Sequence, residues 1–158
     1  MKDFSDLVGH LLFAVHADRQ ADTVSLVTTA GVVTMRHDQD CCEGVILSEV
    51  SGEGAHPGVV IRLAEDRTTG GDHSSPSPWG ADEDSWTATW YAIRTDGDDI
   101  DAHWQGAYNG YYLEHVGIYV DPLTVEHVEA LPPDARVSLD RWLGAGGVMN
   151  VAAKAVEL

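Results

Sequence analysis

The chain has 158 residues and a formal net charge of −17, because it carries 26 acidic side chains and only 9 basic ones. A chain of this length can bury roughly two-thirds of its unfolded surface without a disulfide or metal, which predicts a single domain over residues 1–158. The charge repels nucleic acid and anionic membranes at long range, so it argues against binding to either and favours a basic partner.

The carboxylates are spread along the whole chain. This distribution is typical of a surface adapted for solubility, and an acidic mimic of nucleic acid stays open as a second interpretation. The sequence shows no signal peptide and no apolar run long enough to span a bilayer. It therefore predicts a cytoplasmic protein that does not enter a membrane.

The first half of the chain predicts a short helix followed by strands. Between Phe4 and Val15 apolar residues recur at helical spacing, with Ser5 as a candidate N-cap; an opening strand is the alternative. β-Branched and apolar runs predict strands over residues 23–29, 31–35, 44–50 and 59–64. From Arg67 to Asp84 the residues are mostly Gly, Ser, Pro, Thr and acids, which predicts an unstructured connection that is either mobile or a functional lid.

The second half predicts a strand over residues 85–93, with Trp86 and Trp90 on one face. Asn109-Gly110 is a strong signal for a two-residue hairpin, and it joins expected strands over 100–108 and 111–120. After Asp121-Pro122 the apolar spacing becomes helical. It predicts helices over about 125–131, 134–144 and 148–158.

Together these elements predict an α+β fold. Its sheet is an antiparallel meander of five to seven strands, with a short N-terminal helix and C-terminal helices. Residues 1–120 would form the β-rich core and residues 121–158 a helical extension of the same domain.

The candidate site is a polar stretch, residues 36–43, that leaves an expected strand, together with an aromatic stretch at 104–112 that looks like its counterpart. The predicted ligand-binding residues are Arg36, His37, Gln39, Asp40, Glu43, Trp104, Asn109, Tyr111 and Tyr112. Two alternatives stay open: the aromatic residues could be cross-strand pairs, and the polar stretch could be a buried turn that stabilises the fold.

The same stretch allows two kinds of catalysis. Cys41 and Cys42 are the only cysteines, and neighbours in sequence do not bridge easily. Either thiol could pair with His37 as the nucleophile of a small hydrolase, or both could be ordinary buried cysteines. A zinc site would need a distant ligand such as His103 or His115, and adjacent thiols fit it poorly, so no cofactor is expected.

Three motifs carry a family resemblance: His37-Asp38-Gln39-Asp40-Cys41-Cys42-Glu43, the strand from Ser85 to Tyr91, and Trp104 with Asn109-Gly110-Tyr111-Tyr112. In this order, over about residues 7–120, the chain resembles a family of small uncharacterised bacteriophage proteins classed as a domain of unknown function. It departs from the family where Tyr108 and Leu113 stand in place of serine.

The resemblance implies a phage accessory protein in the cytoplasm of an infected host cell, and it brings no catalytic residues. The leading hypothesis is a non-catalytic binding or inhibitory module that acts on a host component, either a defence protein or a small signalling ligand. The alternative is a cysteine- or metal-dependent hydrolase that uses residues 37–43. A homodimer also stays open.

Overall fold

The computed structural model describes residues 1–38, 44–72, 85–108 and 116–146. A 3-10 helix, η1, spans Phe4–Leu7, and two α-helices span Val125–Glu129 (α1) and Pro133–Gly144 (α2). The strands are β1 Leu11–Asp18, β2 Thr23–Thr28, β3 Gly31–Arg36, β4 Gly44–Ser51, β5 Gly54–Asp72, β6 Ser85–Thr95, β7 Asp99–Tyr108 and β8 Gly117–Asp121.

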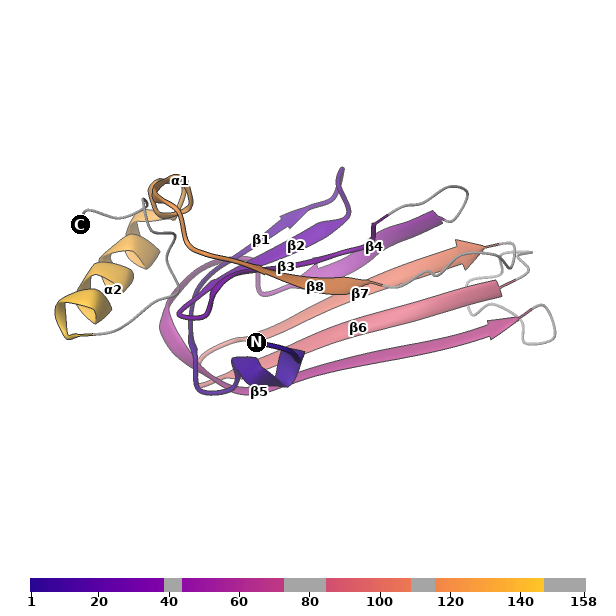
Figure 1. The fold of residues 1–158 in the computed structure, drawn as a ribbon, viewed down its shortest axis with the longest axis horizontal. Coiled ribbons are helices and arrows are strands. Elements are labelled where there is room, and N and C mark those ends of the chain that lie inside the picture. The colour runs from indigo at the N-terminus through magenta and orange to yellow at the C-terminus, as the bar shows by residue number, and fades with distance from the viewer. Residues whose placement is uncertain (39–43, 73–84, 109–115, 147–158) are drawn as a thin grey trace.

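All strands pair antiparallel, in the order β4-β7-β6-β5-β1-β2-β3-β8. The 19-residue strand β5 joins two halves, because its first part pairs with β1 and residues 61–72 pair with β6. Figure 1 shows β5 curving strongly, so that the halves lie over each other as two layers. We call β1, β2, β3 and β8 the helix-covered layer, and β4, β7, β6 and residues 61–72 of β5 the open layer.

The main core lies between these layers. Alternate residues of each strand point inward, and their side chains form one buried cluster that includes Leu12, Leu26, Val33 and Met35 from one layer and Leu47, Ile61, Tyr91, Ile93 and Trp104 from the other. Phe4 of η1 joins this cluster and packs edge-on against the Tyr91 ring, with ring centroids 4.8 Å apart. The helix η1 therefore closes part of the gap between the layers.

A second core forms outside the helix-covered layer. Phe13 and Val32 point away from the main core and pack with residues of the C-terminal helices, among them Leu139. The predicted helices over about 125–131 and 134–144 are thereby confirmed, and the tail over 148–158 lies outside the described residues. In the part of the chain that the structure describes, no helix covers the outer face of the open layer.

The sheet has eight strands, more than the five to seven predicted, although its antiparallel character is confirmed. The additional strand is β1, most of which the helical spacing assigned to the first helix. Leu12, Phe13, Ala14 and Val15 are all buried, because one face of β1 meets the main core and the other meets the second core. A strand buried on both faces has no polar–apolar alternation to mark it as β-structure.

The unstructured connection predicted from Arg67 was wrong for its first part. Residues 67–72 continue β5 and pair with β6, and the hydroxyls of Thr68 and Thr89 lie 3.3 Å apart across the two strands. The polar composition reflects a largely exposed strand end, which propensity alone does not separate from a loop. The rest of the predicted connection, residues 73–84, lies outside the described residues.

The predicted hairpin between residues 100–108 and 111–120 was also wrong. A strand has only two edges, and β7 pairs with β4 along one and with β6 along the other. Strand β8 instead pairs with β3, at the opposite end of the strand order. Asn109 and Gly110 themselves lie outside the described residues.

Tyr91 gives the fold a specific alkaline sensitivity. Its hydroxyl donates to the Val116 carbonyl oxygen at 2.7 Å, and burial is the main reason that the pKa of Tyr91 is raised from 10.0 to about 12. The unfolded chain releases this proton at a lower pH than the folded chain does. The contribution of Tyr91 to the free energy of unfolding is therefore complete below about pH 10 and is lost as the pH rises toward 12. We expect a loss of about 2 kcal/mol over this interval, measured by urea unfolding.

The Tyr91→Phe variant is the control, because it has no proton to lose at this position. It should be less stable than the native protein at pH 8, by about 1 kcal/mol, because the Val116 carbonyl loses its donor. Its stability should then fall less between pH 10 and 12. An equal fall in both proteins would assign the alkaline sensitivity to other groups.

Candidate functional site

The structure places only some of the sequence-predicted site residues. Arg36 ends β3 and His37 follows it. Eight others lie outside the described residues: Gln39, Asp40, Cys41, Cys42, Glu43, Asn109, Tyr111 and Tyr112. The Cys–His hypothesis, the buried-turn interpretation and most of the predicted ligand surface therefore stay predictions.

Trp104 requires a correction, because it was expected at the ligand surface and is buried in the core instead. Its exposed fraction is 1%. Its ring meets Tyr91 edge-on with centroids 5.8 Å apart, and its indole N–H donates to the Asp22 carbonyl oxygen at 2.8 Å. The hydrogen bond satisfies the polar end of a residue that otherwise serves packing.

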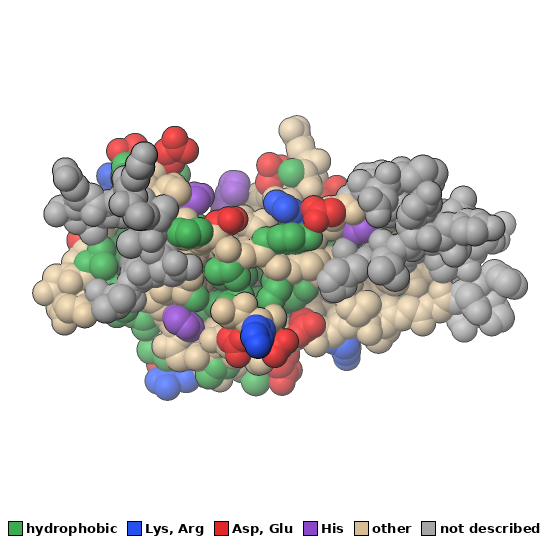
Figure 2. Space-filling view, in the orientation of Figure 1, with side chains coloured by type: hydrophobic (Ala, Val, Ile, Leu, Met, Phe, Trp, Pro, Cys, Tyr) green, Lys and Arg blue, Asp and Glu red, His purple; other side chains and the backbone are tan. Residues whose placement is uncertain are grey.

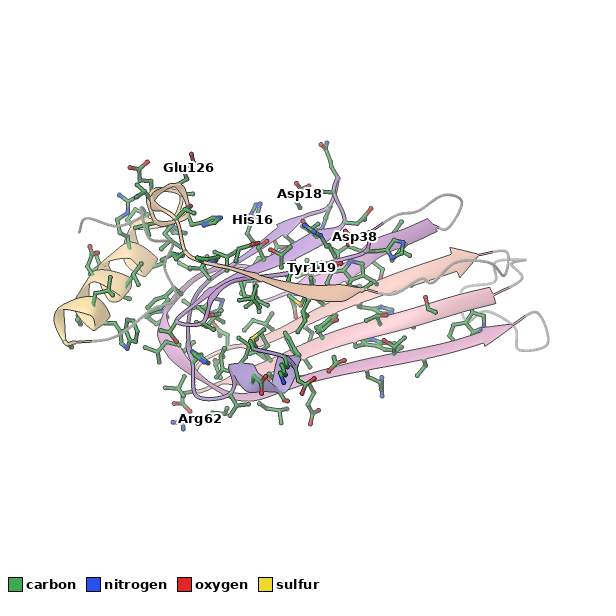
Figure 3. All side chains as sticks on the ribbon, viewed as in Figure 1. His16, Asp18, Asp38, Arg62, Tyr119 and Glu126 are labelled. Atoms are coloured by element: carbon green, nitrogen blue, oxygen red, sulfur yellow. The ribbon has the colours of Figure 1, made fainter. Side chains whose placement is uncertain are left out.

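Arg36 belongs to a small exposed cluster with Asp38 and Tyr119. Its guanidinium lies 4.0 Å above the centre of the Tyr119 ring, and its Nε donates to Asp38 Oδ1 at 3.1 Å. The Tyr119 hydroxyl donates to the same carboxylate, and Figure 3 shows Asp38 and Tyr119 close together. This hydrogen bond is the main cause that lowers the pKa of Asp38 and raises that of Tyr119. An anionic ligand would need the positive charge of Arg36, and Asp38 already forms an ion pair with it.

A second group of side chains crosses the outer face of the open layer. Backbone register aligns Arg67 of β5, Trp90 of β6, His103 of β7 and Glu49 of β4, and we call these four residues the Trp90 row. The Arg67 guanidinium carbon lies 4.5 Å from the centre of the Trp90 ring. The Trp90 and His103 rings stack with centroids 4.5 Å apart and planes 4° from parallel. Cross-strand neighbours on one face thus build a continuous stack.

Ser48 fixes the orientation of the His103 ring. It sits at a β-bulge between Leu47 and Glu49, and its hydroxyl donates to the His103 carbonyl oxygen at 2.9 Å. His103 Nδ1 lies 3.0 Å from the same hydroxyl oxygen, and because the hydroxyl has a single proton, Nδ1 is the donor of this contact when that proton goes to the carbonyl oxygen. Burial lowers the pKa of His103, which keeps the ring neutral near pH 7.

With the hydroxyl proton donated to the backbone carbonyl, Ser48 is not activated as a nucleophile. A general base must accept the hydroxyl proton, and in that tautomer the imidazole nitrogen is a donor. The other ring nitrogen, Nε2, is buried and has no hydrogen-bond partner among the described residues. The pair therefore positions the stacked ring. Within the described ranges, no group of three or more His, Cys, Asp or Glu side chains could hold a metal ion.

Two open hollows lie beside Trp90. The Glu49 hollow has a volume of about 420 Å³ and is lined by Arg19, Ser48, Glu49, Val50, Ser51, Trp90, Asp101, Ala102 and His103. The Arg67 hollow has a volume of about 600 Å³ and is lined by Ser5, Ala64, Glu65, Asp66, Arg67, Trp90, Ala92, Arg94 and Asp101. Trp90 and Asp101 line both, so the two hollows adjoin each other at these residues.

Sequence reasoning missed the Trp90 row. The alternation of the tryptophan strand correctly placed Trp86 and Trp90 on one face, but it gave no information on the neighbouring strands. The four residues of the row come from positions 49 to 103 and meet only through strand pairing. Their individual residue types carry no motif that would have signalled the row.

The chain matches a protein family described as a domain of unknown function (DUF7448), over residues 5–118. The chain belongs to this family. The DUF7448 match runs from η1 to the beginning of β8, so it includes the open layer with the whole Trp90 row and all of the helix-covered layer except most of β8, while α1 and α2 lie beyond it. No curated protein and no solved structure matches the chain. No helix among the described residues is long and apolar enough to cross a membrane.

Proposed function

We propose that this DUF7448 protein is a non-catalytic binding module that attaches to a host protein through the outer face of the open layer. The resemblance noted in the sequence supports its role as a phage accessory protein acting in the host cytoplasm. The observation that carries the proposal is the Trp90 row, a pre-stacked aromatic and charged group on a face that the described helices leave uncovered.

A partly exposed tryptophan beside two hollows is the kind of anchor that dominates protein–protein interfaces. Stacking between Arg67 and His103 holds the ring in place before any partner arrives, which reduces the entropy lost on binding. Small-molecule sites usually enclose most of the ligand surface. These hollows are open, so they suit a protein surface better than a small signalling ligand.

Site-specific photocrosslinking tests the binding face. Ile46 of β4 and Val137 of α2 have nearly equal exposed fractions, 54% and 56%, but they lie on the open layer and on the helix. The photoreactive residue p-benzoylphenylalanine is placed at either position, and the protein is irradiated in host cells. We expect a discrete crosslinked host protein from position 46 and none from position 137.

A second variant ties the crosslink to Trp90. Adding Trp90→Ala to the position-46 protein should remove the crosslink, because a truncated anchor typically costs an interface about 2 kcal/mol or more. The variant must keep the unfolding midpoint of its parent within a few degrees. Crosslinks from both positions, or a crosslink that survives the loss of Trp90, would contradict the proposal.

A further inference from the structure

The charges around Trp90 indicate the chemistry of the partner. Arg19 lines the Glu49 hollow, but its guanidinium is bound to Glu53 at 2.7 Å. Arg94 lines the Arg67 hollow, and Asp101 holds it at 2.9 Å. Two of the three arginines that line the hollows are therefore neutralised within the protein.

More carboxylates than guanidinium groups line the two hollows. Glu49 and Glu65 are exposed, one in each hollow, and neither has an ion-pair partner among the described residues. Asp101 uses Oδ1 for Arg94 and also lines both hollows. The remaining arginine, Arg67, is stacked on Trp90. The ring of His103 adds no positive charge while it is neutral.

We propose that the partner presents a basic segment, whose arginine or lysine side chains meet Glu49 on one side of Trp90 and Glu65 on the other. This inference rests on the proposed binding face and adds the chemical class of what binds there. Glu49 belongs to β4 and Glu65 to β5, which are three strand spacings apart, or roughly 14 Å across the sheet. Glu49 is in register with Arg67, and Glu65 lies two residues before Arg67 on β5, so the two glutamates are roughly 16 Å apart. An extended segment covers that distance in about four to five residues.

The whole molecule favours the same partner. A net charge of −17 attracts a basic protein at long range and speeds its encounter. Figure 2 shows acidic side chains scattered over the described part of one face, several of them beside basic ones, and not gathered in one patch. The long-range attraction between the net charge and a basic protein therefore does not determine where the protein binds. The selection comes from Glu49 and Glu65, which have no ion-pair partner among the described residues, and from the stacked ring between them.

The test uses short labelled peptides with two arginines separated by three residues, and a matched peptide in which citrulline replaces both arginines. Citrulline keeps the size and planarity of the side chain but is neutral. Binding to the full chain is followed by fluorescence anisotropy at low and at physiological salt. We expect the arginine peptide to bind more tightly than the citrulline peptide, with weaker binding at higher salt.

Three variants locate the binding: Glu49→Gln, Glu65→Gln and the control Glu126→Gln. All three remove one negative charge, and Glu126 lies on α1, away from the open layer (Figure 3). Each of the first two should weaken binding roughly two- to five-fold, as expected for an exposed ion pair, and the control should leave it unchanged. An equal loss in all three, or equal affinity for the citrulline peptide, would overturn the inference.

The two proposals fail in distinguishable ways. If position 46 still captures a host protein in a Glu49→Gln, Glu65→Gln double variant with undiminished yield, the binding face stands and the basic partner is wrong. If position 46 captures nothing, the proposed function itself is wrong.

Discussion

Replacing Trp104 by alanine should destabilise the protein by about 3–5 kcal/mol, the usual cost of removing a large buried aromatic side chain. The ring packs in the main core against Tyr91, and its N–H anchors the turn that contains Asp22. The variant leaves a cavity and also an acceptor without its donor. Urea unfolding followed by circular dichroism measures the loss, and the peptide-binding assay should show little change at a temperature where the variant is folded.

Trp90→Ala is the matched comparison, because it deletes the same side chain from the neighbouring strand β6. Trp90 lies on the outer face, so its loss should cost clearly less stability than the loss of Trp104 and should abolish the photocrosslink. The reverse pattern, a stable Trp104→Ala variant that fails to bind, would restore Trp104 as a ligand-binding residue. Similar unfolding costs for both would place Trp90 in the supporting structure.

Much of the fold follows from local sequence signals. The strands β2, β3, β4, β6 and β7 were predicted within a few residues, because each has a β-branched or aromatic run bounded by turn residues. The two C-terminal helices also follow from local spacing and from Pro132-Pro133. These elements carry their signal within their own residues.

The incorrect predictions concern features that depend on distant parts of the chain. The sequence of β1 does not alternate between polar and apolar residues, because α2 and the open layer bury its two faces, and neither is near it in sequence. The hairpin failed because β4 and β6 occupy both edges of β7, which no short motif reveals. The strand order and the bend of β5 are properties of the assembled sheet.

The candidate site shows the same division. Residues 36–43 form a sequence signal because several polar and reactive side chains are consecutive there, and the structure describes Arg36, His37 and Asp38 of them. The Trp90 row has no such signal, because its members are single residues on four strands. Cross-strand register creates the site, and register is set by the whole sheet.

Asp22 should be the most sensitive position outside the core, because it ties the two layers together at the turn between β1 and β2. Its Oδ1 accepts the Leu47 N–H of β4 at 2.9 Å, and its carbonyl oxygen accepts the Trp104 indole N–H at 2.8 Å. It also holds a φ of 55°, the left-handed region that aspartate and asparagine tolerate better than alanine does. Asp22→Ala should cost about 2–4 kcal/mol, from a lost acceptor and from backbone strain.

Two further variants separate these causes. Asp22→Asn keeps both a side-chain oxygen and the tolerance for positive φ, so it should cost less than about 1 kcal/mol, whereas Asp22→Gly relieves the strain but still leaves the Leu47 N–H without its acceptor. Because β4 is an edge strand of the sheet, that N–H lies on an edge available to other chains. We therefore expect Asp22→Ala and Asp22→Gly, but not Asp22→Asn, to self-associate in concentrated solution, measured by light scattering. Equal stability and equal scattering in all three would mean that the turn joins the layers through its backbone alone.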